Sequence, residues 1–124
     1  MKLIIAGGRE FTHFKGAFAH YLVINNQGII TEIVSGGARG ADKVGELIAE
    51  AEGLTIKLFE ADWDTHGKSA GYIRNSEMAD YGDMLLAFWD GKSKGTKHMI
   101  DLATKKGLEV KVVRYIVRYK DAEV

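Results

Sequence analysis

The chain has 124 residues, and its 17 basic and 17 acidic side chains give a formal net charge of zero. That length suits a single core, so we expect one domain over residues 1–124. Zero net charge argues against extensive sequence-independent binding to nucleic acid and against a polybasic patch that binds a membrane. Without cysteine, the chain has no disulfide, thiolate metal site or cysteine nucleophile. The apolar run at residues 3–6 is too short to cross a membrane, and we expect a cytoplasmic protein with no membrane partner.

Apolar runs alternate with helical stretches along the whole chain. Runs typical of strands lie at residues 3–6, in the later part of 29–34, and at 54–59, 84–89 and 110–113. Helices are expected over residues 14–25, 41–52, 70–81 and 97–106. Residues 60–69 have no regular pattern and predict a long loop, which in a small domain is often functional.

This alternation predicts an α/β fold, a Rossmann-like doubly wound parallel sheet of about five strands with helices on both faces. The expected strand order is 3-2-1-4-5. In such a sheet the carboxyl ends of the strands share one edge, and a ligand binds there at the point where the strand order reverses. The loops at residues 7–12, 35–42, 60–69 and 90–96 follow strands, so they should meet at that edge.

Glycine-bearing loops follow the first, second and fourth of these strands. Each has few bulky side chains and leads toward a helix N-terminus, where bare N–H groups and the helix dipole favour a phosphate. The loop at residues 35–42 lacks the ending of a P-loop and the full G-x-G-x-x-G pattern, so a purely structural turn is the alternative. Candidate ligand-binding residues in the three loops are Gly7, Gly8, Arg9, Ser35, Gly36, Gly37, Arg39, Gly40, Asp42, Asp90, Ser93, Gly95 and Thr96.

Charged and aromatic side chains near these loops supply the candidate chemistry. The guanidiniums of Arg9, Arg39 and Arg74 can each take two phosphate oxygens, or else form surface ion pairs. The indole of Trp63 can stack on a base, whereas Trp89 at a strand end fits the core. The candidate catalytic carboxylates are Glu10, Asp42 and Asp90. A helix-dipole role for the second of these and a loop-bracing role for the third are the alternatives.

Five motifs follow one another in a recognisable order. They are Gly7-Gly8-Arg9-Glu10-Phe11, residues 35–42, Ala61-Asp62-Trp63, residues 67–71 with Arg74-Asn75, and residues 88–91 with 93–96. Together they resemble the small YspA-type branch of the SLOG superfamily over nearly the whole chain. That superfamily includes the LOG phosphoribohydrolases, the DNA-processing protein DprA, and sensor domains for nucleotide-derived signals. The resemblance implies a nucleotide-binding domain. It supports Trp63 and Arg74 as candidate ligand-binding residues and adds Asp62 and Asn75.

One position departs from the LOG pattern. LOG enzymes carry a catalytic glutamate in the segment that matches residues 93–99, and this chain has Met99 at that position. A thioether neither acts as a base nor stabilises an oxocarbenium centre. The resemblance therefore favours binding of a nucleotide or nucleotide-derived small molecule, by a sensor or sequestering protein, over hydrolysis of a nucleoside monophosphate at its N-glycosidic bond. Single-stranded DNA binding of the DprA kind is the second alternative, motivated by the basic and aromatic tail at residues 114–120.

No cofactor and no metal are expected, since the four histidines lack metal-binding spacing. Nucleic acid is not expected as a partner either, because the net charge is zero. A homo-oligomer, most simply a two-fold dimer, is expected, since the region of the first helix has more large apolar side chains than one sheet face needs. They are Phe11, Phe14, Phe18, Tyr21 and Leu22.

Overall fold

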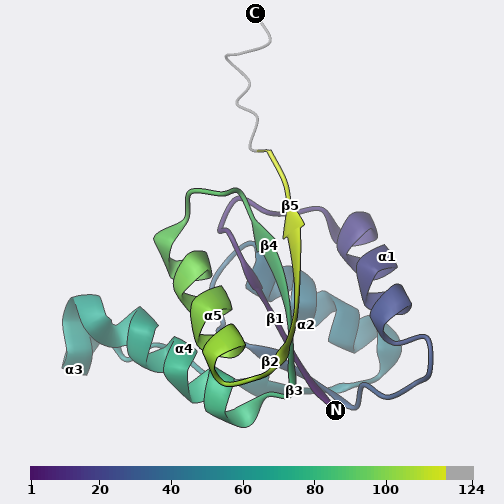
Figure 1. Cartoon of the computed structure of the whole chain (residues 1–124), viewed down its shortest axis with the longest axis horizontal. Coiled ribbons are helices and arrows are strands. Elements are labelled where there is room, and N and C mark those ends of the chain that lie inside the picture. Colours follow the sequence, from purple (N-terminus) through teal and green to yellow (C-terminus); the bar gives the residue numbers. More distant parts are fainter. Residues whose placement is uncertain (117–124) are drawn as a thin grey trace, which may run out of the picture.

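A five-stranded parallel sheet runs through the middle of the molecule, with helices on both faces (Figure 1). The structure is a computed structural model that describes residues 1–116. Its elements are β1 (Lys2–Gly7), α1 (Phe14–Ile24), β2 (Glu32–Ser35), α2 (Ala41–Glu52), β3 (Thr55–Leu58), α3 (Trp63–His66), the 3-10 helix η1 (Gly67–Ser69), α4 (Ala70–Tyr81), β4 (Met84–Trp89), α5 (Lys94–Lys105) and β5 (Glu109–Arg114). The strand order is β3-β2-β1-β4-β5, and every pairing is parallel, so the predicted fold and strand order are confirmed.

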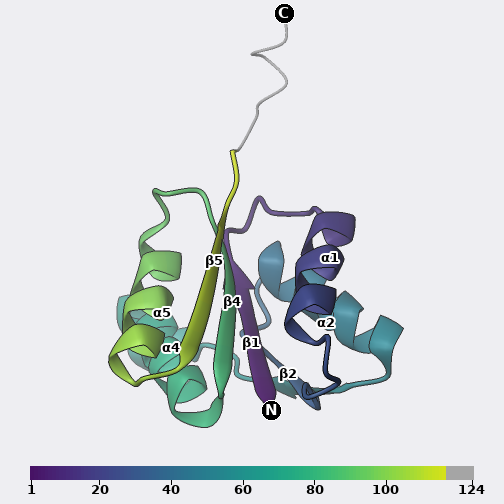
Figure 2. The same ribbon diagram turned by 45° about the vertical axis from the view of Figure 1, so that its right-hand side comes forward.

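Two apolar cores lie on opposite faces of the sheet. Alternate residues of β1 divide between them: Leu3 and Ile5 pack with α1 and α2, while Ile4 and Ala6 pack with α4 and α5. Figure 2 shows the two helix pairs on either side of the central strands. Because β1 is buried on both faces, it forms the continuous apolar run that parallel strands require. This packing fixes the carboxyl ends of β1, β2 and β4 at one edge of the sheet.

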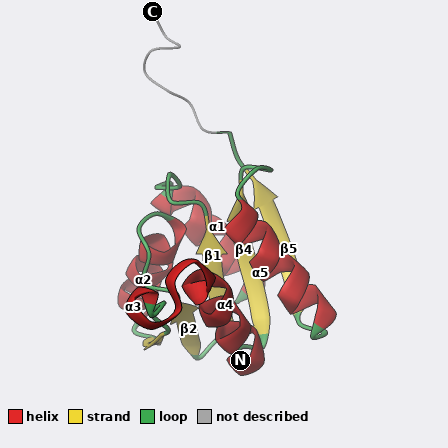
Figure 3. Ribbon diagram, turned by 90° about the vertical axis from the view of Figure 1, so that its left-hand side faces the viewer, coloured by secondary structure: helices red, strands yellow, loops and turns green. Residues whose placement is uncertain are grey.

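The segment predicted as an irregular loop at residues 60–69 is partly helical. It contains α3 and η1, which lead directly into α4 (Figure 3). Asp62 caps α3, since its Oδ1 accepts a hydrogen bond from the N–H of Thr65 at 3.1 Å. A four-residue helix is too short to leave an apolar period in the sequence, which explains the wrong prediction.

Two boundaries near the glycine-bearing loops also differ from the prediction. Ser35 is the last residue of β2 and not part of the loop, and α5 begins at Lys94, so the fourth loop ends at residue 93. Ser93 caps α5 by accepting a hydrogen bond from the N–H of Thr96 at 3.4 Å. Residues 117–124, which include most of the basic and aromatic tail, lie outside the described residues. Within residues 1–116, no helix is both long and apolar enough to cross a membrane.

Candidate functional site

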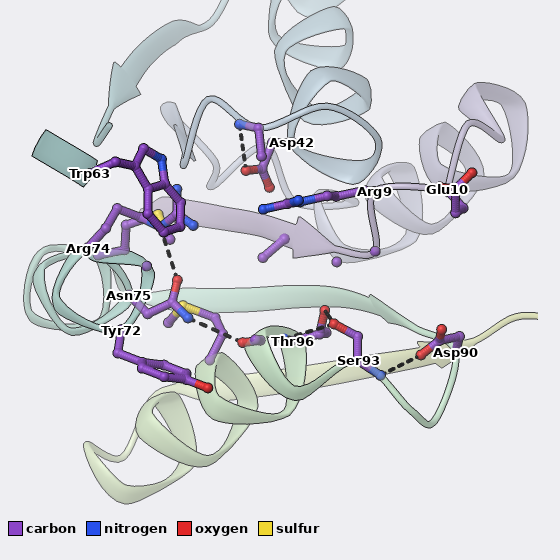
Figure 4. A pocket seen from close by; sticks show the side chains of 18 of the residues that line it. Arg9, Glu10, Asp42, Trp63, Tyr72, Arg74, Asn75, Asp90, Ser93 and Thr96 are labelled. Atoms are coloured by element: carbon purple, nitrogen blue, oxygen red, sulfur yellow. Dashed lines mark hydrogen bonds between the residues drawn. The ribbon is translucent and has the colours of Figure 1, made fainter. Parts of the chain in front are cut away.

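A cavity of about 440 Å³ opens at the carboxyl edge of the sheet, beside the ends of β1 and β4. The strand order reverses between these two strands, which is where ligands bind in open α/β sheets. Predicted site residues that line this first cavity are Gly7, Gly8, Arg9, Glu10, Asp42, Trp63, Arg74, Asn75, Asp90, Ser93, Gly95 and Thr96. The geometry therefore brings together residues from four segments that are far apart in the sequence (Figure 4).

The remaining predicted residues lie elsewhere. Gly36, Gly37 and Arg39 line a second, adjoining cavity, whereas Ser35, Gly40 and Asp62 line neither cavity. Ser35 is fully buried, and its hydroxyl donates to Glu46 Oε2 at 2.7 Å and accepts from the N–H of Gly37 at 3.1 Å. Ser35 thus braces the loop rather than facing the cavity. The same holds for Asp62, whose carboxylate caps α3.

Arg9 has a guanidinium that is open to a ligand. Its side chain extends across the cavity in Figure 4, and it lines both cavities. No hydrogen bond or ion pair engages its guanidinium within the part of the chain that the structure describes. Arg39, by contrast, forms an exposed ion pair with Glu10 at 3.3 Å, which is a weak interaction in water. An anion can therefore bind Arg9 without breaking an existing contact.

Several backbone N–H groups of the glycine-bearing loops are already occupied. The N–H of Gly8 donates to the carbonyl of Phe88, and that of Ala41 donates to the carbonyl of Gly8. The N–H of Gly37 donates to Ser35 Oγ, and that of Ala38 donates to Asp42 Oδ2 at 3.0 Å. These bonds hold the loops in place, and they make these four N–H groups unavailable to a ligand. Side-chain guanidiniums are therefore further candidates for holding an anion, beside the N–H groups that remain.

Asp42 lies at the start of α2 and is only 6% exposed. Burial raises the pKa of its carboxyl to about 6, against the opposing effects of the Ala38 N–H and of Arg74. Gly36 leaves room for it, because a Cβ there would lie 2.8 Å from Asp42 Oδ2 and 2.5 Å from Arg74 Nη1 and would displace one of these side chains. The carboxyl lies in the first turn of α2, where the helix dipole favours a negative charge.

Arg74 and Asn75 join two loops across the cavity. Arg74 Nη1 donates to the carbonyl of Gly36 at 2.6 Å, and its Nε donates to Asn75 Oδ1 at 3.1 Å. Asn75 Nδ2 in turn donates to the carbonyl of Gly95 and lies 3.2 Å from His98 Nδ1. Burial lowers the pKa of His98, which favours the neutral ring that can accept this bond. The pair therefore positions the loop after β2 relative to the first turn of α5.

Burial also lowers the pKa of Arg74. Asp42 opposes this shift, and the nearby positive charge of Arg9 adds to it. Two guanidiniums that repel each other at one cavity favour an anion between them, because its charge relieves the repulsion.

The loop after β4 is braced by its own side chains. Asp90 Oδ1 accepts hydrogen bonds from the N–H groups of Lys92 and Ser93, both at 2.8 Å. These bonds lower the pKa of Asp90, so its carboxyl stays ionised. Asp90 nevertheless lines the cavity, as does the buried Thr96 in the first turn of α5. Trp89 is half-buried and donates from Nε1 to the carbonyl of Ser93, so it supports this loop rather than the ligand.

Aromatic side chains frame the opening. Trp63 is 54% exposed, and in Figure 4 it lies at the same end of the cavity as Tyr72, opposite Glu10 and Asp90. Tyr72 and Tyr115 both line the cavity but were missed from the sequence. The Tyr115 hydroxyl lies over Gly8, where any Cβ would collide with it. Tyr115 follows β5 directly, so the rule that strand ends share one edge was the signal that would have found it.

Met99 also lines the cavity and is almost fully buried. The position that the resemblance matches to the glutamate of LOG enzymes therefore lines the cavity with a thioether. Among residues 1–116, no cluster of three or more metal-ligating side chains occurs.

The fold is similar to that of DNA processing protein A from Helicobacter pylori, a solved structure described for its single-stranded DNA binding mode. The TM-score is 0.70 at 19% sequence identity, and the match covers 95% of this chain and 67% of that one. The finding contradicts our expectation that nucleic acid is not a partner. A net charge of zero describes the whole chain and does not exclude local contacts with phosphates: Arg9, Lys68 and Arg74 line the cavity, as do the carboxylates of Glu10, Asp42 and Asp90.

Two comparisons of sequence identify the family. Gene 61 protein of Mycobacterium phage D29 is 39% identical, over 88% of this chain and 93% of that protein. Residues 1–66, which contain the first two glycine-bearing loops and Trp63, match the family described as YspA, cpYpsA-related SLOG. The match covers more than half of the chain. The chain therefore belongs to the YspA, cpYpsA-related SLOG family.

Proposed function

We propose that this protein binds a nucleotide, or a molecule derived from one, in the first cavity. The observation that carries the proposal is the Arg9 guanidinium, which extends into the cavity without a partner among residues 1–116. A volume of about 440 Å³ lies within the range of small-molecule sites. The exposed ring of Trp63 offers a surface for a base, and Arg9 and Arg74 offer charge for a phosphate.

Calorimetric titration with adenosine, guanosine and thymidine monophosphates tests this proposal. Arg9→Ala should weaken binding by about tenfold or more, because it removes a charge-assisted hydrogen bond. Lys105→Ala is the matched control, since Lys105 is an exposed cation at the end of α5 and lines neither cavity. Failure of every nucleotide to bind, or equal weakening by both variants, would contradict the proposal.

We further propose that the bound molecule is not hydrolysed. Met99 offers neither a base nor a negative charge at the cavity, which is why binding is favoured over N-glycosidic cleavage. Chromatography after prolonged incubation should recover a nucleoside monophosphate intact. Release of free base would overturn this part of the proposal and direct attention to Glu10, Asp42 and Asp90.

Single-stranded nucleic acid is a second candidate ligand, favoured by the likeness to DNA processing protein A. An exposed indole beside guanidiniums is also the combination that single-stranded nucleic acid sites use. Fluorescence anisotropy with a labelled oligothymidine at two salt concentrations tests this candidate. Binding that weakens with salt and is lost in Arg9→Ala supports it, whereas equal binding of a matched duplex would argue against a single-strand site.

A further inference from the structure

The first and second cavities adjoin and are two compartments of one crevice. The second has a volume of about 450 Å³, close to the 440 Å³ of the first. Arg9, Ala38, Trp63 and Arg74 line both. The compartments therefore adjoin across a shared wall, which includes two guanidiniums and an exposed indole.

The shared wall suits a negatively charged group that is attached to a further part of the ligand on each side. Arg9 has no partner among the described residues, and its charge acts on Arg74 from close by. Arg74 is fixed by its bond to the Gly36 carbonyl, so it presents its charge without having to be ordered by the ligand. A phosphate at this wall would contact both cations and could be approached from either compartment.

The second compartment has its own chemistry. Gly36, Gly37, Arg39, Glu60 and Ala61 line it and do not line the first. Gly37 is left-handed at φ +74°, and a Cβ there would lie 3.0 Å from Leu58 Cδ1, so bare backbone forms this side. The volume falls in the range of sites for whole small molecules and exceeds what a phosphate alone would need.

We infer that the ligand has two nucleoside-sized units joined by a phosphate or pyrophosphate, with one unit in each compartment and the linking group at Arg9 and Arg74. This inference rests on the proposed function and extends it to a class of ligand. Two kinds of molecule contain two nucleosides joined in this way: a dinucleotide linked by pyrophosphate, and two successive nucleotides of a single strand. A ligand that occupies both compartments should bind more tightly than a single unit, because binding of the first unit holds the second close to its own compartment.

Calorimetry with three probes tests the inference: adenosine monophosphate, diadenosine pyrophosphate and a thymidine dinucleotide. At least one of the two-unit probes should bind about tenfold or more tightly than the mononucleotide. Ala61→Trp fills only the second compartment, so it should reduce the affinity of that probe to the level of the mononucleotide and leave the mononucleotide unaffected. Ala61→Ser is the control that changes the side chain without filling the space.

A second pair of variants tests the second compartment independently, in case Ala61→Trp does not fold. Arg39→Ala removes a cation of the second compartment, and Lys105→Ala removes an exposed cation at the end of α5 that lines neither cavity. Only Arg39→Ala should weaken the two-unit probe, and neither should affect adenosine monophosphate. If the mononucleotide binds but neither two-unit probe binds more tightly, or if Ala61→Trp weakens all probes equally, the inference is wrong while the proposed function stands. If no probe binds, the proposed function itself fails.

Discussion

Asp42 is the residue whose electrostatics most affect both the fold and the site. Its carboxyl is buried at the start of α2, faces Arg74, Glu46 and Lys43, and has a pKa raised to about 6. A carboxyl with a raised pKa binds a proton more tightly in the folded than in the unfolded protein. Its contribution to stability is therefore fully present below pH 3.8 and is lost as the pH rises through about 6.

Asp42→Asn should stabilise the protein at pH 7. The asparagine can still accept the hydrogen bond from the Ala38 N–H but carries no charge that burial would penalise. The shift from 3.8 to about 6 sets an upper limit on the order of 3 kcal/mol for the gain. Urea denaturation at several pH values measures it, and stability should vary less between about pH 4 and pH 7 in the variant. A variant less stable than the natural chain at pH 7 would contradict the electrostatic argument.

Binding of a phosphorylated ligand should also be coupled to the proton on Asp42. An anion near Arg9 and Arg74 raises the pKa of this carboxyl further, so the complex takes up a proton near neutral pH. Affinity for adenosine monophosphate should therefore increase as the pH falls from about 8 to about 6. Calorimetry in buffers of different ionisation enthalpy measures the proton uptake directly. Unchanged uptake in Asp42→Asn would assign the proton to another group, such as the phosphate itself.

At the scale of elements, the junction between the first loop and α2 depends on Gly40. Its φ of 80° and ψ of −128° are accessible only to glycine, and it precedes the first residue of α2. A Cβ there would lie 2.3 Å from the Gly8 carbonyl oxygen and 2.6 Å from Arg9 backbone atoms. Gly40 therefore lets the loops after β1 and β2 contact each other, which positions Arg9 without Gly40 itself lining the cavity.

Gly40→Ala should destabilise the fold by about 4 kcal/mol, the sum of a strained backbone and an overpacked contact. Gly53→Ala is the matched control, since Gly53 also has a positive φ of 67° but has no atom within 4 Å of the place that a Cβ would take. That change should cost only about 1–2 kcal/mol. Thermal denaturation of both variants measures the difference. Similar losses would show that backbone conformation alone, without the contact to the first loop, explains the effect.

At the scale of the whole molecule, the homo-oligomer stays a prediction. Much of the apolar surface that motivated it belongs to the core: Phe11 and Tyr21 are buried, and Phe14 and Phe18 pack against the same cluster. Leu22 and its neighbour Val23 remain exposed on α1. The argument for a second chain now depends on these two side chains.

A double change, Leu22→Lys with Val23→Lys, should convert a dimer to a monomer because it places two charges in an apolar interface. Light scattering coupled to size exclusion measures the mass at micromolar concentration. Leu47→Lys, an exposed apolar position on α2, is the control for a general effect of added charge. If the unsubstituted protein already has the mass of a monomer, the prediction of a homo-oligomer is wrong.

The sequence by itself determined the fold class, the strand order and the edge at which the loops meet. Buried parallel strands leave continuous apolar runs, and right-handed crossovers permit few connections between them, so local patterns were enough for the fold class. The strand order was expected because it is the one typical of a Rossmann-like sheet, and the structure confirms it. They also identified most residues that line the first cavity, because strand ends share one edge.

Only the tertiary structure decided which donors and charges remain open to a ligand. Ser35 looked like a loop residue but is buried against Glu46, and the N–H of Ala38 is taken by Asp42. Arg74 is fixed by a carbonyl 38 residues away, and Tyr115 reaches Gly8 from the far end of the chain. Such partners are set by packing between distant segments, and the free guanidinium of Arg9 is what remains among residues 1–116 once those bonds are made.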